Sequence, residues 1–198
     1  MVRERYNAIP SRSLASCAPS GLPETMVPPR VAIDSPAIEV MTDLRRVPAV
    51  SIGPDVGLDH ANNAMILRGV RLLLVVGDDG TVIGTVGATD ILGERPLQRT
   101  SEKRVNRNEL VVRDVMVPAD DADVLDLGDV LHGEVGHVVA TLERLGRQHV
   151  LVVDRDAAEG SLVRGIFSAT QIARQLGVAL QTTEIARTFA QIESTFAG

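Results

Sequence analysis

The fold of this chain is decided by LLLVVGDDGTVIGTVG at residues 72–87 and by a second stretch of similar design, VLVVDRDAAEGSLVRGIF at residues 150–167. Each stretch has two runs of aliphatic residues separated by a turn rich in Gly and Asp. Such runs are typical of strands, and Asp-Asp-Gly between the runs of the first stretch predicts a β-hairpin. The deciding unit therefore occurs twice, with a longer turn in the second copy.

The residues around the two hairpins also repeat in order. Val-Met at 40–41 is echoed at 115–116, and strand-like runs follow at 47–52 and 124–127. Each copy then has a helical pattern with apolar residues at i, i+3 and i+7. These residues are Leu58, Ala61 and Met65 in the first copy and Val135, Val138 and Leu142 in the second.

The spacing between the copies identifies them as a duplication. Gly69 and Gly146, each placed for a left-handed turn at the end of a helix, are 77 residues apart. Gly84 and Gly165, beyond the turn of the hairpin, are 81 residues apart. One four-residue insertion with both flanks in register indicates repetition of a whole unit, closed in each copy by a short helix at 88–92 or 169–173.

The sequence predicts five segments. They are an irregular N-terminal tail at 1–34, a first repeat at 35–97, a basic linker at 98–112, a second repeat at 113–180 and an amphipathic helix at 181–198. The last has Ile185, Phe189, Ile192 and Phe196 on one helical stripe. We expect this stripe to pack on its own module or to clamp a neighbouring subunit.

Composition and charge exclude several classes of protein. The 198 residues are 44% hydrophobic and 23% charged, as in soluble globular proteins. The net charge of −6 argues against nucleic-acid binding, although residues 95–113 carry +4. Cys17 is the only cysteine, so an internal disulfide is excluded. The sequence has neither a membrane-length apolar run nor a secretory signal, and we expect a cytoplasmic protein with no membrane partner.

The order strand, helix, hairpin, helix resembles the cystathionine β-synthase (CBS) domain. The resemblance is carried by LVVGDDGTVIG at 74–84 with Asp90, and by LVVD at 151–154 with GIFS at 165–168. The whole chain resembles a stand-alone bacterial CBS-pair protein. It implies an α/β fold in which two repeats pack about a pseudo-twofold axis as a Bateman module, and it implies a homodimer.

The same resemblance implies two clefts that bind adenosine-containing ligands. In the family a Ser or Thr approaches phosphate, an Asp takes the ribose hydroxyls, and backbone near the strands frames the adenine. The candidate ligands are AMP, ADP, ATP and S-adenosylmethionine, with no cofactor required. The expected ligand-binding residues are Leu72, Arg71, Gly87, Thr89 and Asp90 from the first repeat and His149, Ser168 and Gln171 from the second.

Neither copy has the complete family pair. The first has Gly87 at the hydroxyl position and keeps Asp90, whereas the second keeps Ser168 and has Gln171 at the carboxylate position. This pattern predicts that ribose recognition is confined to the first-repeat site, and that Asp90→Ala weakens nucleotide binding.

Each candidate residue also has a structural interpretation. Asp90 is either a ribose ligand or a favourable charge in the first turn of a helix. Ser168 and Gln171 fit a capping box, which predicts that Ser168→Ala lowers stability. Arg71 and His149 either face an anionic ligand or are solvated at the strand ends. Asp129, His132, Glu134 and His137 have no standard metal spacing and are expected in a surface loop.

We therefore expect a non-catalytic regulatory module that senses an adenosine-containing ligand. A ligand would shift the relation of the two repeats, and an unknown protein effector would detect the change. The alternative is a structural or interaction module whose clefts bind no nucleotide. No nucleophile has a sequence context that indicates activation, so an enzyme is not expected.

Overall fold

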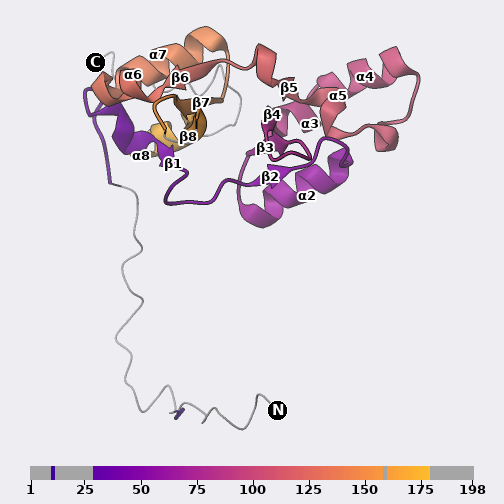
Figure 1. Ribbon diagram of the computed structural model, residues 1–198, viewed down its shortest axis with the longest axis horizontal. Helices are drawn as coiled ribbons and strands as arrows, with labels where there is room; N and C mark the ends of the chain where they lie inside the picture. The colour runs from indigo at the N-terminus through magenta and orange to yellow at the C-terminus, as the bar shows by residue number, and fades with distance from the viewer. Residues whose placement is uncertain (1–9, 12–28, 158–159, 179–198) are drawn as a thin grey trace.

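The computed structural model describes residues 10–11, 29–157 and 160–178 (Figure 1). Cys17, most of the predicted tail and the predicted helix at 181–198 lie outside these residues. Over the described ranges, no helix combines the length and apolar character needed to cross a membrane.

The elements follow the duplicated order that the sequence predicts. The first copy contains η2 (Ala37–Val40), β1 (Thr42–Asp43), β2 (Ser51–Ile52), α2 (Leu58–Arg68), β3 (Leu72–Val76), β4 (Val82–Gly87) and α3 (Ala88–Leu92). The second contains α5 (Val112–Val115), β5 (Val117–Pro118), η4 (Ala119–Asp121), β6 (Val124–Asp126), α6 (Leu127–His132), α7 (Val135–Leu145), β7 (His149–Asp154), β8 (Leu162–Ser168) and α8 (Ala169–Gln175). Between the copies lie α4 (Arg95–Lys103) and η3 (Arg107–Glu109).

The predicted helix faces and helix ends are confirmed. The i, i+3, i+7 residues of α2 and of α7 are all buried, with at most 4% of their surface exposed. Gly69 and Gly146 end these helices in the left-handed conformation, with φ of 64° and 60°. In contrast, the strand predicted at 47–52 is limited to Ser51–Ile52, since Pro48 lacks an N–H for a strand ladder.

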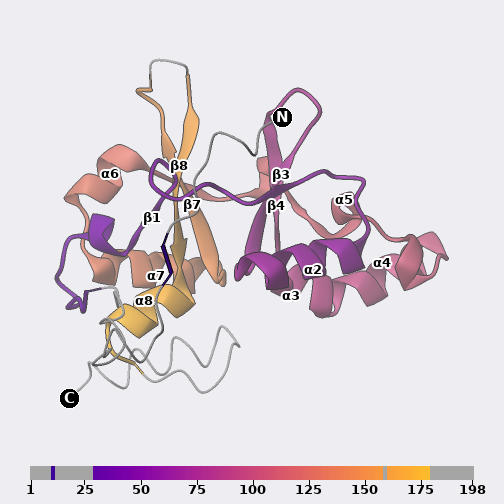
Figure 2. The same ribbon diagram turned by 90° about the horizontal axis from the view of Figure 1, so that it is seen from below.

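The strands form two four-stranded sheets with the same design. One sheet has the order β2-β3-β4-β5 and the other has the order β1-β8-β7-β6. In each, a short strand runs parallel to the first strand of the hairpin, and the hairpin itself is antiparallel. Figure 2 shows the two hairpins side by side, with α2 and α3 below one sheet and α7 and α8 below the other.

The repeats exchange their first strands. β1 of the first repeat pairs with β8, with Thr42 opposite Ile166, and β5 of the second repeat pairs with β4, with Val117 opposite Thr85. These two pairings are equivalent under the duplication, because β1 and β5 are offset by 75 residues and their partners by 81. Each sheet therefore contains strands from both repeats.

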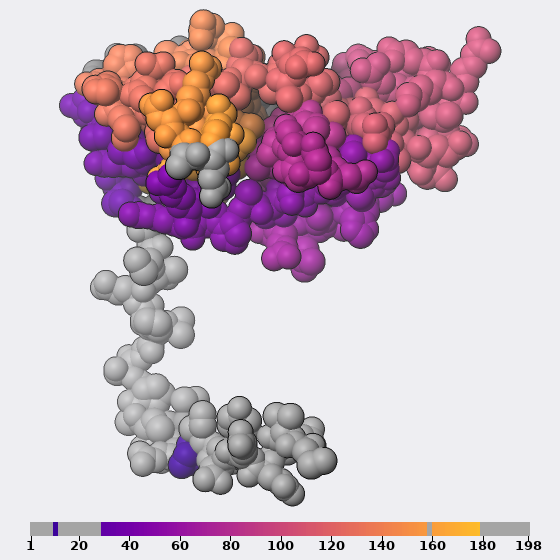
Figure 3. Space-filling model, viewed as in Figure 1, coloured from indigo at the N-terminus to yellow at the C-terminus, as the bar shows by residue number. Residues whose placement is uncertain are grey.

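The hydrophobic cores follow the exchange. Ala37, Val40 and Met41 from the start of the first repeat pack with Phe167 and Ile172 of the second. Leu110, Val112 and Val115 pack in turn with the first repeat. Figure 3 shows the indigo start of the first repeat against the orange and yellow atoms of the second. The repeats seen in the sequence are thus not the units that pack together.

Two equivalent glycines permit the exchanged strands to approach. A Cβ on Gly84 would collide with the backbone carbonyl of Val117 in β5. A Cβ on Gly165 would collide instead with the side chain of Met41, next to β1. The exchange of β1 is also held by an ion pair between Asp43 and Arg164, whose hydrogen bonds hold the pKa of Asp43 below its usual value.

The basic linker predicted at 98–112 includes most of the helix α4, which begins three residues earlier, and its basic side chains contribute to the fold. Arg95, Arg99 and Arg107 donate hydrogen bonds to the carbonyls of Val115, Asp114 and Ile91, respectively. Lys103 pairs with the buried Asp114. Burial raises the pKa of Asp114, but hydrogen bonds from Lys103 and the Val111 N–H outweigh it, so the net pKa is lowered. These basic side chains satisfy groups where the two repeats meet.

Candidate functional site

Two clefts lie where the sheets of the two repeats meet. The first cleft is lined by Leu72, Thr85, Gly87, Thr89, Asp90, Val117, Ala122, Asp123 and residues 145–151. The second cleft is lined by Thr42, residues 69–72, His149, Ile166, Ser168, Thr170, Gln171, Arg174 and Gln175. Leu72 and His149, at equivalent positions of the two repeats, line both clefts.

The two clefts are built from the same positions of the duplicated unit. Equivalent linings include Gly87 and Ser168, Thr89 and Thr170, Asp90 and Gln171, Gln148 and Arg71, and Val117 and Thr42. The structure therefore brings the predicted residues together in two sets. Leu72, Gly87, Thr89, Asp90 and His149 line the first cleft, and Arg71, Leu72, His149, Ser168 and Gln171 line the second.

The clefts differ in the room that they offer. The first has a volume of about 100 Å³, whereas the second has a volume of about 430 Å³. Ligand pockets for drug-sized molecules usually measure about 300–1,000 Å³. Only the second cleft falls in this range as it stands.

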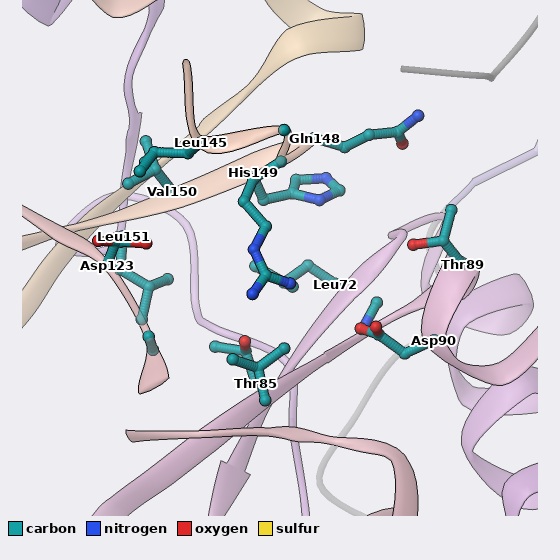
Figure 4. A pocket seen from close by; sticks show the side chains of 15 residues that line it. Leu72, Thr85, Thr89, Asp90, Asp123, Leu145, Gln148, His149, Val150 and Leu151 are labelled. Atoms are coloured by element: carbon teal, nitrogen blue, oxygen red, sulfur yellow. The ribbon is translucent and has the colours of Figure 1, made fainter. Parts of the chain in front are cut away.

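Asp90 is held from inside the protein. Its Oδ2 accepts a hydrogen bond of 2.8 Å from the Gly87 N–H, and its Oδ1 lies 3.1 Å from Nη1 of Arg95. Figure 4 shows Thr89 and Asp90 on one side of the first cleft and Gln148 and His149 on the other. A ribose hydroxyl would have to share the carboxylate with both partners. Asp90 therefore has a structural role that needs no ligand.

Ser168 and Gln171 do not form the predicted capping box. Ser168 occupies the N-cap of α8, but its side chain makes no cap hydrogen bond. Gln171 accepts a hydrogen bond of 3.1 Å from the hydroxyl of Thr42 instead. The exchanged strand β1 brings Thr42 beside α8. Gln171 therefore bonds to this distant residue instead of to the backbone N–H of Ser168, as a capping box would require.

The second cleft is lined by two cations that have no acidic partner in the part of the chain that the structure describes. Arg71 precedes β3 and Arg174 lies on α8, so the two guanidinium groups come from different repeats. Neither makes an ion pair with any residue in the described ranges, and no carboxylate from those ranges lines this cleft. An anion is the ligand that such a wall favours.

Comparisons with known proteins find a matching family model and similar folds. Residues 37–96 match the family model of the CBS domain. The fold is similar to that of an uncharacterized conserved protein from Pyrococcus horikoshii, with a TM-score of 0.54 and 20% identity, covering 77% of this chain and 100% of that one. It is also similar to a CBS domain protein of unknown function from Thermoplasma acidophilum, with a TM-score of 0.50 and 18% identity, covering 78% of each chain.

A third similar structure is a CBS-domain containing protein from Agrobacterium tumefaciens. The TM-score is 0.50 and the identity 16%, covering 69% of this chain and 93% of that one. This chain has the fold of a tandem CBS pair. No curated protein matches its sequence.

His149 lines both clefts as a neutral side chain. Burial, together with the positive charge of Arg71, lowers the pKa of His149 from 6.5 to about 4. Its counterpart in the first repeat is the apolar Leu72. At neutral pH, the ring is therefore an uncharged donor and acceptor in the wall of both clefts.

Several residues that line the two clefts are not in the predicted set. Arg174 and Gln175 follow Gln171 by three and four residues, so helical periodicity from Gln171 could have identified both. Thr42 reaches the second cleft on the exchanged strand β1, and Asp123 reaches the first cleft in the segment that follows β5. No local pattern marks these two, since their positions depend on contacts between distant parts of the chain. Arg147 lies only two residues before His149, so its place beside the first cleft could have been inferred from that residue.

The acidic and histidine-rich segment of the second repeat forms helix ends. The ring of His132 hydrogen-bonds to the carbonyl of Gly128, and the ring of His137 accepts a hydrogen bond from the Glu134 N–H. His132 thus lies at the end of α6 and His137 in the first turn of α7, where the sequence predicts a surface loop. Across the described part of the chain, no three metal-ligating side chains gather at one point.

Proposed function

We propose that this CBS pair is a non-catalytic regulatory module that binds an adenosine-containing ligand between its repeats. The observation that carries the proposal is the pair of equivalent clefts at the junction of the repeats. A molecule in either cleft touches both repeats, because each cleft takes lining residues from both. Binding there can bias the arrangement of one repeat against the other, which is what a regulatory module requires.

The chemistry of the linings supports an adenosine ligand. Apolar residues such as Leu72 and Ile166 offer surface to a base, and Ser168 and Thr170 offer hydroxyl donors. Arginines attract phosphate, because a guanidinium makes charge-assisted hydrogen bonds. A nucleotide has a base for the apolar side chains, oxygen atoms that accept hydrogen bonds from the hydroxyls, and phosphate for the arginines.

One observation favours the alternative, a structural module that binds no nucleotide. Asp90 already has a hydrogen bond to the Gly87 N–H and an ion pair with Arg95. The carboxylate that resembles the family's ribose ligand therefore has internal partners that explain its presence. This observation concerns the first cleft only, whereas the cationic side chains of the second cleft have no such partners in the described ranges.

Thermal unfolding of the full chain with AMP, ADP, ATP, S-adenosylmethionine and NADH tests the proposal. A ligand at about 100 times its Kd stabilises the folded state by about 2.7 kcal/mol. For a chain of this size, this raises Tm by roughly 5–10 °C. We expect such a rise with at least one compound of the panel. An unchanged Tm with every compound at millimolar concentration would favour the structural alternative.

A further inference from the structure

We propose that the second cleft selects phosphate-bearing adenosine compounds over uncharged and cationic ones, with Arg71 and Arg174 as its phosphate contacts. This inference rests on the proposed function and names the ligand class within it. It assigns nucleotide binding to the second cleft, although Asp90, the residue that resembles a ribose ligand, lies in the first.

The charges of the two linings carry the argument. In the described chain, the charged residues of the second cleft are Arg71 and Arg174 alone. The first cleft has Gln148 at the position equivalent to Arg71, and the position equivalent to Arg174 is Gly93, which does not line it. The charged residues that line the first cleft are two carboxylates, Asp90 and Asp123, and one cation, Arg147. The second cleft therefore has two positive charges, whereas the first has two carboxylates that are balanced by Arg147 in its lining and by Arg95, which pairs with Asp90.

The neutral polar groups of the second cleft complement an anion. The hydroxyl of Ser168 makes no cap bond, and Thr170 lies two residues further along in the same lining. Both hydroxyls can donate to phosphate oxygens. Gln175 is 5% exposed, and its Oε1 is buried without a hydrogen-bond partner in the described chain. A hydroxyl or amine of a nucleoside that reached this oxygen would satisfy it.

S-Adenosylmethionine is disfavoured by the same wall. It carries a sulfonium and an ammonium group against one carboxylate, so its net charge is positive. Like charges repel most where water is partly excluded. Adenosine has no charge with which to use either arginine. The expected order of affinity is therefore ATP and ADP above AMP, then adenosine, with S-adenosylmethionine weakest.

Isothermal titration of the full chain with adenosine, ADP and S-adenosylmethionine tests this order. We expect ADP to bind at least about tenfold more tightly than adenosine at low ionic strength, with the difference shrinking as salt is added. Arg174→Gln should weaken ADP binding about ten- to a hundredfold, the loss typical of a charge-assisted hydrogen bond. It should change adenosine affinity by less than about twofold, since uncharged adenosine makes no such bond.

A matched control removes the same charge outside the clefts. Arg144 is exposed on α7, lines neither cleft and makes no ion pair in the described part of the chain. Arg144→Gln should therefore leave the ratio of ADP to adenosine affinity unchanged. Arg174 is also exposed, so the folding of both variants can be checked by an unchanged Tm.

The outcomes separate this inference from the proposed function. Equal affinities for adenosine and ADP, unaffected by Arg174→Gln, would overturn the inference and leave the proposed function standing. Pyrophosphate binding that depends on Arg174, with no binding of any adenosine compound, would support the anion site and overturn the proposed function. Tightest binding of S-adenosylmethionine would overturn the inference alone. Binding of neither pyrophosphate nor an adenosine compound would overturn both.

Discussion

The first and second clefts occupy the same positions of a duplicated unit, yet they differ in charge and in room. The backbone around the two clefts is alike because each cleft is built on one copy of the hairpin, one exchanged strand and one of two equivalent glycines. Their chemistry differs because a few lining positions have changed, among them Gln148 against Arg71 and Asp90 against Gln171. In this chain, the backbone contacts that fix the fold are separate from the side chains that distinguish the two clefts.

The shared wall of the clefts adds a second lesson. Leu72 and His149 line both clefts, and each sheet contains a strand from the other repeat. A ligand that displaces one wall must therefore alter the other cleft as well. Substitutions at three pairs of residues test the difference between the clefts. These are Leu72 and His149 in the shared wall, Gly84 and Gly165 beside the exchanged strands, and Asp90 and Ser168 at the helix starts.

The largest expected effect is on the pH dependence of stability, and it arises from His149 but not from its counterpart Leu72. The pKa of His149 is lowered to about 4 in the folded chain, so between pH 6.5 and about 4 the unfolded chain binds the proton and the folded chain does not. The stability associated with the neutral ring is complete above about pH 6.5 and falls as the pH drops toward 4, by up to about 3 kcal/mol. His149→Leu should remove this part of the pH dependence.

Urea unfolding at several pH values between 7 and 4.5 measures this difference. The comparison of the two proteins isolates His149, because the carboxyl groups titrate in both. Parallel stability curves for wild type and His149→Leu would contradict the neutral, half-buried histidine.

The next effect compares the two strand crossings. Ala at position 84 must displace the backbone of β5, because its Cβ would collide with the Val117 carbonyl. Ala at position 165 must displace only the flexible side chain of Met41. We expect Gly84→Ala to cost about 2–3 kcal/mol of stability and Gly165→Ala about 1 kcal/mol. Equal losses in denaturant unfolding would show that the two crossings tolerate a side chain alike.

The smallest effect compares the two helix starts. Asp90→Ala removes a hydrogen bond to the Gly87 N–H and an ion pair with Arg95, so we expect a loss of about 1 kcal/mol. Ser168 makes no cap hydrogen bond, so Ser168→Ala should change stability by less than about 0.5 kcal/mol. Thermal unfolding of both variants without ligand is the measurement. A larger loss for Ser168→Ala would restore the capping box predicted from the sequence.

The repeats and their helices could be predicted because their signals are local. Periodic apolar residues such as Leu58 and Met65, and a glycine such as Gly69, report on the residues beside them. The exchange of β1 and β5 could not be predicted in this way. Each is a two-residue strand, too short to show alternation, and its partner lies more than 30 positions away in the chain.

The sequence could predict which residues line the clefts, but not which partners their side chains contact. Asp90, Ser168 and Gln171 line the clefts where the resemblance places them. Their partners follow from tertiary contacts: Arg95 reaches Asp90 from α4, and Thr42 reaches Gln171 from an exchanged strand. A sequence names the side chains available to a ligand, but the packing decides which of them already have a partner.

The central claim is that the two equivalent clefts are not equivalent binding sites. Isothermal titration of ADP into the full chain, into Arg174→Gln and into Asp90→Ala tests it most directly. The account predicts one tightly bound ADP per chain, weakened about tenfold or more by Arg174→Gln and kept by a folded Asp90→Ala. Two sites of equal affinity per chain, or a single site lost in Asp90→Ala and kept in Arg174→Gln, would contradict it.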